Sequence, residues 1–286
     1  MTSPPRIDAH QHFWQLSRGD YHWLNPAMPE LFRDFGPVDL APHLRHHGID
    51  GTILVQASPT EAETRYLLQL AQECADVCGV VGWIDFDAAD AVERVAEIAR
   101  HSLIVGVRPM VQDMFDDQWL SRPQLADVLE AVAAHGLTFD ALVKPVHLSS
   151  LLAMVGRHPN LPVVIDHGAK PEIADAEWRD GPGCRAWLDD MAALGEIPSV
   201  CCKLSGLMTE AIGSDHLLPR FMEHLLQRFG PQRLIWGSDW PVALLAGSYE
   251  KWVTICERTL APDVRGPIMG GNAQAFYLSR RGRRGG

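Results

Sequence analysis

The feature that most constrains the fold of this chain is a regular alternation of short apolar segments with longer segments of helical periodicity. Short apolar runs without strict polar alternation are typical of parallel strands that are covered on both faces. The predicted strands are 6–14, 51–56, 79–85, 104–108, 137–143, 162–167, 199–204 and 233–237. The predicted helices are 39–47, 61–77, 88–101, 123–135, 147–158, 183–194, 215–229, 249–260 and 272–278. Eight strands that are each followed by a helix predict an α/β protein, a single (β/α)8 or TIM barrel.

The length of 286 residues suits one such barrel, and 47% hydrophobic residues suffice for its core. Because no Gly/Ser-rich linker interrupts the series, we expect a single domain over residues 1–279. The basic segment 280–286 is predicted to be a disordered tail. Segment 15–37, which follows the first strand, is longer than an ordinary connection and rich in aromatic residues. We predict that this long aromatic loop packs over a pocket as a lid.

Composition and charge exclude several classes of function. A formal net charge of −11 disfavours nucleic acid as a partner. No apolar run is long enough to span a membrane, and the first residues lack the apolar core of a signal peptide, so a cytoplasmic protein is expected. The six cysteines lie in apolar helical or strand-like contexts, which favours reduced core thiols over disulfides. Metal binding by Cys74 and Cys78, one helical turn apart, is the alternative.

The first predicted strand ends in two histidines that are separated by one residue. Side chains alternate between the two faces of a strand, so His10 and His12 point the same way and Gln11 points the opposite way. Two imidazoles on one face can share a metal ion. The alternative reading is two polar residues at a strand end with no ligand.

Other strands also end in ionisable or polar residues. These are Arg108, Asp166, His167, Lys203, Ser205 and Asp239. In a TIM barrel the C-terminal strand ends surround one mouth, where such groups converge on a ligand. His10, His12, His167 and Asp239 offer three nitrogens and a carboxylate, a set that suits one zinc-like ion. Alternatively, the aspartates cap the following segments and His167 bonds to the backbone. His147, after the fifth strand, is a weaker candidate.

Several segments carry a family resemblance that spans nearly the whole chain. They are 7–14, Tyr21 with 23–24, 105–108, 164–171, 203–206 and 236–241. Together they resemble the amidohydrolase superfamily, and within it the branch of sugar lactonases that act on lactones such as L-fuconolactone and L-rhamnono-lactone. The resemblance implies a carboxylic-ester hydrolase that converts a sugar lactone to the aldonic acid.

The resemblance also implies roles for individual residues. His10, His12, His167 and Asp239 match the central site, with Asp239 as general base and acid. The expected cofactor is one divalent metal ion, zinc first. A binuclear centre is not expected, because no lysine ends the fourth strand and the middle strands supply one histidine. The expected catalytic residues are Asp239, His167 and Arg108. The expected substrate contacts are Tyr21, Trp23, Trp83, Asp140, Lys203 and Trp240.

Three alternatives stay open at this point. The first is a metal-independent reaction, in which His10, His12 and Arg108 polarise the carbonyl by hydrogen bonding. The second is a related enzyme on the same barrel, either a hydrolase of another cyclic ester of the pyrone dicarboxylate type or a decarboxylase. A dicarboxylate would call for several arginines at the mouth, and only Arg108 qualifies, which favours a neutral sugar lactone. The third is a metal- or ligand-binding barrel without turnover. The expected partner is the small-molecule lactone, with a homo-oligomer left open.

Overall fold

The structure, a computed structural model, describes residues 4–281. Within them, eight parallel strands pair in the order β1 to β8. The strands are β1 (Ile7–Gln11), β2 (Gly51–Val55), β3 (Val77–Gly82), β4 (Ile104–Val107), β5 (Thr138–Ala141), β6 (Val163–Ile165), β7 (Val200–Leu204) and β8 (Leu234–Trp236). Just past the strand ends, the His12 N–H donates to the Trp240 carbonyl at 2.8 Å, and the Asp239 N–H donates to the His10 carbonyl at 2.8 Å. These bonds join the last strand to the first, so the predicted (β/α)8 barrel is confirmed.

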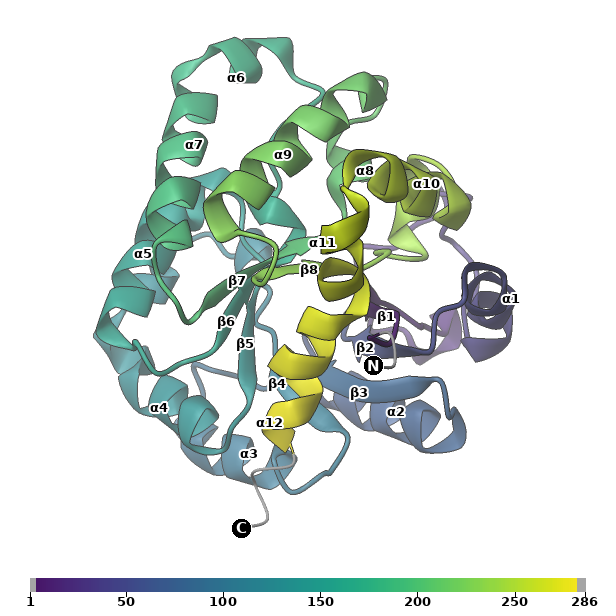
Figure 1. The fold of residues 1–286 in the computed structure, drawn as a ribbon. Coiled ribbons are helices and arrows are strands. Elements are labelled where there is room, and N and C mark those ends of the chain that lie inside the picture. The colour runs from purple at the N-terminus through teal and green to yellow at the C-terminus, as the bar shows by residue number, and fades with distance from the viewer. Residues whose placement is uncertain (1–3, 282–286) are drawn as a thin grey trace.

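Helices surround the sheet (Figure 1). They are α1 (Pro37–His47), α2 (Glu61–Glu73), α3 (Ala91–Ile98), α4 (Ala126–Ala134), α5 (Leu148–Arg157), α6 (Ala176–Asp180), α7 (Pro182–Gly195), α8 (Leu207–Glu210), α9 (Leu218–Phe229), α10 (Tyr249–Thr259), α11 (Pro262–Gly266) and α12 (Ser279–Arg281). Apolar side chains fill two layers, a large one between sheet and helices and a small one inside the barrel. Among the described residues, no helix is both long and apolar enough to cross a bilayer.

The C-terminal segment closes one end of the barrel, where the strands begin. In Figure 1 it runs in yellow from α11 to α12 across the strands. The Asn272 side chain donates to the carbonyls of Pro231 and Leu234 at 2.8 and 2.7 Å. Gly270 packs so closely that an added Cβ would lie 1.8 Å from the Pro5 carbonyl oxygen. The opposite end, where the strands finish, is therefore the open one. Helix α12 reaches Arg281, and residues 282–286 of the predicted tail lie outside the described residues.

One predicted boundary is wrong in an instructive way. Helix α2 ends at Glu73, and Val77 already belongs to β3, although the apolar spacing extends the predicted helix to Val77. Cys74 has an extended backbone and terminates the helix, so Cys74 and Cys78 are not one helical turn apart. Cys74, Cys184, Cys201, Cys202 and Cys256 are free thiols, and the last four of these are buried.

The segment between β1 and α1 is irregular and packed. Trp14 and Phe35 pair their backbones across it, and Trp14 also packs edge-on against Trp23. The Trp23 indole N–H donates to the Ala57 carbonyl at 2.8 Å, and the Ser58 hydroxyl donates to a carbonyl in this segment at 2.6 Å. Hydrogen bonds therefore hold the segment against the connection between β2 and α2. Its action as a lid stays a prediction.

Candidate active site

The ends of β1, β6 and β8 bring a carboxylate against three imidazoles. The hydrogen bonds between β1 and the chain after β8 set Asp239 beside the histidines of the first strand. Its Oδ1 atom faces three ring Nε2 atoms, at 3.3 Å from His12, 3.7 Å from His10 and 3.9 Å from His167. All four side chains are buried. His167 and Asp239 both have positive φ, a conformation rare outside glycine that turns each side chain away from the regular strand direction.

The outer hydrogen bonds of two rings define which nitrogen faces the carboxylate. His12 Nδ1 lies 2.8 Å from the Val55 carbonyl oxygen, which can only accept, so this nitrogen carries the proton. In the neutral ring, the Nε2 lone pair then faces the Asp239 oxygen. Two acceptors 3.3 Å apart call for a proton or a cation between them. His167 Nδ1 lies 2.9 Å from the Ser205 hydroxyl, which likewise leaves its Nε2 toward Asp239.

The donor set fits a divalent metal ion. Two sets of three residues each place their donor atoms within 4.8 Å of one another. One set is His10, His12 and Asp239, and the other is His10, Asp166 and His167. Imidazole nitrogens with a carboxylate oxygen are the donors that zinc takes in catalytic sites. Hydrogen bonds from the outer ring nitrogens, as at His12 and His167, are the usual support of such ligands.

His10 differs from the other two rings in its neighbours. Arg108 Nη1 lies 3.3 Å from its Nε2, and Lys203 Nζ lies 3.1 Å from its Nδ1. Asp166 Oδ1 lies 3.4 Å from the same Nδ1. His10 is thus held between two cations and a carboxylate, which fixes the ring in place.

A buried charged layer lies beneath the imidazoles, inside the barrel. Lys203 Nζ is 2.7 Å from Asp140 and 3.0 Å from Asp166, and the Tyr277 hydroxyl donates to Asp140 at 2.6 Å. Asp166 also pairs with Arg108 at 3.2 Å. Asp140 and Lys203 are fully buried and do not line the mouth, so the structure does not bring these two expected substrate contacts to it. From the sequence, Asp166 was predicted only as one of the strand-end residues around the mouth or as a cap of the following segment.

Burial and neighbouring charges shift the pKa values of the groups in this cluster. Burial, followed by the nearby Lys203, holds the pKa of His10 well below its ordinary value. Burial also lowers the pKa of His167 to about 4. Burial opposes ionisation of Asp239, but the adjacent imidazoles outweigh it and hold the pKa of this carboxyl well below its usual range. Near neutral pH, neutral His10 and His167 therefore surround an ionised carboxylate, which can accept a proton or bind a cation.

A cavity of about 230 Å³ opens above the cluster. Its floor includes His12, Arg108, His167 and Asp239. The apolar part of its wall consists of Met28, Ala57, Met110, Leu142, Val242 and Leu245. The polar and aromatic part consists of Trp23, Gln112, Asp113 and Lys170. The mixture suits a small molecule with one apolar face and several hydroxyl groups. The sequence did not point to Gln112, Asp113 and Lys170, because they lie in or next to short 3-10 turns several residues beyond the ends of β4 and β6.

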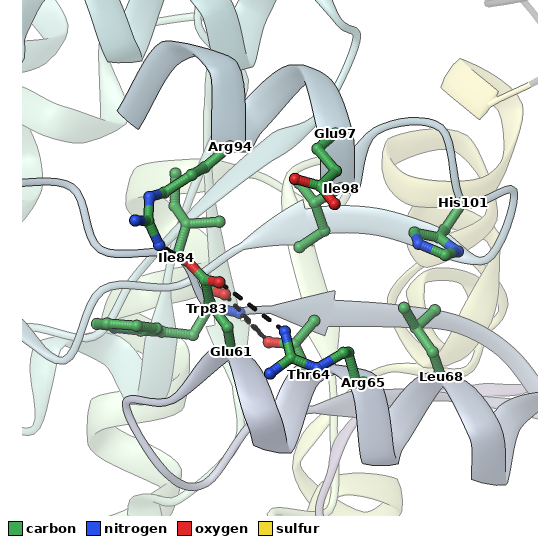
Figure 2. A pocket seen from close by; sticks show the side chains of 10 residues that line it. All are labelled: Glu61, Thr64, Arg65, Leu68, Trp83, Ile84, Arg94, Glu97, Ile98 and His101. Atoms are coloured by element: carbon green, nitrogen blue, oxygen red, sulfur yellow. Dashed lines mark hydrogen bonds and ion pairs between the residues drawn. The ribbon is translucent and has the colours of Figure 1, made fainter. Parts of the chain in front are cut away.

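The other expected substrate contacts are dispersed. Trp23 lines the cavity, whereas Tyr21 and Trp240 are buried and do not line it. Trp83 lies in a separate pocket between α2 and α3, on the outside of the barrel (Figure 2). His147 is also absent from the cavity wall, and its Nδ1 accepts the Lys144 N–H at 3.0 Å, a capping role.

Comparison with known sequences gives a family and named relatives. The profile of the amidohydrolase family matches residues 7–278. A protein named L-fucono-1,5-lactonase from Burkholderia ambifaria is 46% identical over 281 residues, which cover 95% of each chain. A second protein of that name, from Burkholderia multivorans, is 37% identical over 284 residues and 95% of each chain.

Comparison with solved structures gives the same fold. An amidohydrolase from Burkholderia multivorans with bound zinc superimposes with a TM-score of 0.88 at 35% identity, covering 96% of this chain and 99% of that one. A probable 2-pyrone-4,6-dicarboxylic acid hydrolase from Acinetobacter baumannii superimposes with a TM-score of 0.77 at 18% identity, covering 95% and 98% of the two chains. At that identity the second likeness concerns the fold alone.

Proposed function

Because this chain belongs to the amidohydrolase family, we propose that it hydrolyses a sugar lactone to the open aldonic acid, with L-fucono-1,5-lactone as the first candidate substrate and L-rhamnono-lactone as the second. The observation that carries the proposal is the Asp239 carboxylate on the floor of a cavity of small-molecule size, where it faces the imidazoles of His10, His12 and His167. The names and near-complete coverage of the two relatives support a carboxylic-ester hydrolase of this kind.

In the proposed reaction, Asp239 acts first as a base and then as an acid. Its carboxylate takes a proton from a water molecule, whose oxygen attacks the lactone carbonyl carbon. The bond between that carbon and the ring oxygen then breaks, and Asp239 returns the proton to the ring oxygen. Asp239 starts this cycle as a carboxylate, because its pKa lies well below its usual range.

The histidines are proposed to hold one divalent ion together with Asp239. His10, His12 and His167 would be its nitrogen ligands, and a bound zinc ion would supply Lewis acidity and lower the pKa of water. The outer hydrogen bonds of His12 and His167 keep these two rings oriented for that purpose. Arg108, held by Asp166 at 3.2 Å, is proposed to keep His10 in position and to add positive charge beside the lactone carbonyl.

The arginine content of the cavity wall favours a neutral sugar over a dicarboxylate, and Lys170 is the one other cationic side chain among the described lining residues. Within residues 4–281, Arg108 is the only arginine that lines the cavity. Its guanidinium is already bonded to Asp166 and to the Gln56 side chain at 3.1 Å. Asp113 and Gln112 are proposed to bind sugar hydroxyls, and Trp23 to cover one face of the ring. Tyr21 and Trp240 would support that wall from behind.

The test is Asp239→Asn, assayed with a pH indicator on a panel of aldonolactones and corrected for spontaneous ring opening. We expect kcat to fall by on the order of a hundredfold or more, the usual effect of removing an acid/base group. Asp113→Asn is the matched control, because it changes another carboxylate of the same cavity away from the imidazoles; it should act mainly on KM. Near-normal turnover of Asp239→Asn, or no turnover of any lactone by the wild-type protein, would contradict the proposal.

A second arm of the test concerns the metal ion. Treatment with a chelator should remove most of the activity, and added zinc should restore it. Full activity with no metal detectable by elemental analysis would favour the metal-independent alternative.

A further inference from the structure

The chain that follows β6 forms a left-handed turn of four residues. The φ angles of residues 167–170 are +54°, +57°, +61° and +50°, although only Gly168 among them is a glycine. The Lys170 N–H donates to the His167 carbonyl at 2.9 Å and closes the turn. Residues three apart in such a tight turn lie on the same side. Accordingly, His167 and Lys170 both line the cavity.

The surrounding structure imposes this unfavourable conformation. The Trp187 indole N–H donates to the Gly168 carbonyl at 2.9 Å, and Ala169 is fully buried. Gly206 lies so close to His167 that an added Cβ would be 2.4 Å from its Nδ1. Left-handed backbone at residues other than glycine is retained mainly where surrounding contacts enforce it, and such positions cluster at functional sites. The turn delivers a second side chain to the cavity besides the histidine.

That second side chain carries a positive charge that is in no close ion pair, although Glu210 lies within reach of its field. Within residues 4–281, Lys170 takes part in no ion pair shorter than 4.0 Å, whereas Arg108 and Lys203 are each held by buried aspartates. Lys170 is half-buried, so it can meet a ligand without the cost of leaving a buried partner unpaired.

From this geometry we infer that Lys170 binds the carboxylate of the aldonate product. The inference rests on the proposed function, in which a neutral lactone becomes an anion when the ring opens. The new carboxylate forms at the carbon atom above His167 and Asp239, and Lys170 stands one turn beyond His167 on the same wall. A cation that is in no close ion pair at this position binds the anionic product more strongly than the neutral substrate.

The experiment compares Lys170→Met, Lys170→Arg and Lys144→Met. Lys144 is exposed in the connection after β5 and does not line the cavity, so its variant removes the same charge elsewhere. The ligands are sodium L-fuconate and neutral L-fucitol, measured by isothermal titration calorimetry, together with the inhibition constant of L-fuconate. We expect Lys170→Met to weaken L-fuconate binding by on the order of tenfold, the scale of one charged hydrogen bond at a partly exposed site. Lys170→Arg should retain most of the affinity, and the KM for neutral lactone should change by a smaller factor.

Several results would overturn the inference. They are unchanged L-fuconate affinity in a folded Lys170→Met, an equal loss in Lys144→Met, equal losses for L-fucitol and L-fuconate, or no binding of L-fuconate by the wild-type protein. Folding of each variant is checked by circular dichroism. The last result would leave lactone hydrolysis standing. Conversely, a wild-type protein that binds L-fuconate through Lys170 but opens no lactone would refute the proposed function and retain the carboxylate site.

Discussion

Replacing Lys203 by methionine should destabilise the barrel more than any loss of a surface charge. The Lys203 ammonium is fully buried and lies 2.7 Å from Asp140, 3.0 Å from Asp166 and 3.1 Å from His10. Methionine fills similar space but leaves two buried carboxylates without their shared cation. Breaking a buried ion pair by removing one partner costs about 3–5 kcal/mol. With an unfolding entropy near 2.1 cal/mol/K per residue, the melting temperature of a chain of this length should fall by about 5–8 °C.

Denaturant unfolding followed by tryptophan fluorescence, with calorimetry for the melting temperature, measures the effect. Lys251→Met is the control, because it breaks a partly exposed pair with Asp215 and should cost about 1 kcal/mol or less. Adding Asp140→Asn to Lys203→Met should recover at least about 1 kcal/mol, since one of the two unpaired charges is removed. Equal losses for Lys203→Met and Lys251→Met, or additive losses in the double variant, would refute the reasoning.

Three further predictions follow from single contacts. Burial raises the pKa of Glu63 from 4.5 to about 7, so the folded state keeps a proton that the unfolded state loses. The free energy of unfolding should therefore fall as pH rises between these two values, by up to about 1.4 kcal/mol per pH unit. Glu63→Gln should flatten this pH dependence in melting curves recorded from pH 5 to 8. An alanine at Gly206 would press its Cβ on His167, and we expect kcat to fall at least about tenfold, as when a residue that orients a metal ligand is replaced. Gly213 is also left-handed but has open space around it, so alanine there should leave kcat close to the wild-type value. Trp23→Phe loses the hydrogen bond to the Ala57 carbonyl and should raise KM a few-fold with little change in kcat. Equal effects on KM and kcat would contradict this expectation.

Much of the site follows from the order of residues along the chain. Parallel strands finish at one end of a barrel, so polar residues that follow apolar runs must gather there. That rule alone predicts that His10, His12, His167 and Asp239 lie close together, and in the structure they do. The eight-fold alternation of strand and helix is equally local, because each segment carries its own periodicity.

The depth and direction of individual side chains are not local properties. Lys203 and Asp140 end or lie within strands just as the site histidines do, yet they pair inside the barrel below the mouth. Trp83 follows β3 closely but turns outward between two helices (Figure 2). Strand register, which shifts within β1 between Asp8 and Gln11, decides which residue of a strand reaches the mouth and which stays beneath it.

The sequence by itself therefore determined the barrel, the end at which the candidate site lies and the four residues that meet at its centre. Only the tertiary structure decided which charges neutralise one another and which remain free for a ligand. Lys170 illustrates the difference, because its place in the cavity depends on a left-handed turn that Trp187 and Gly206 enforce from distant parts of the chain. Local preference disfavours that turn, so no reading of residues 167–170 alone predicts it.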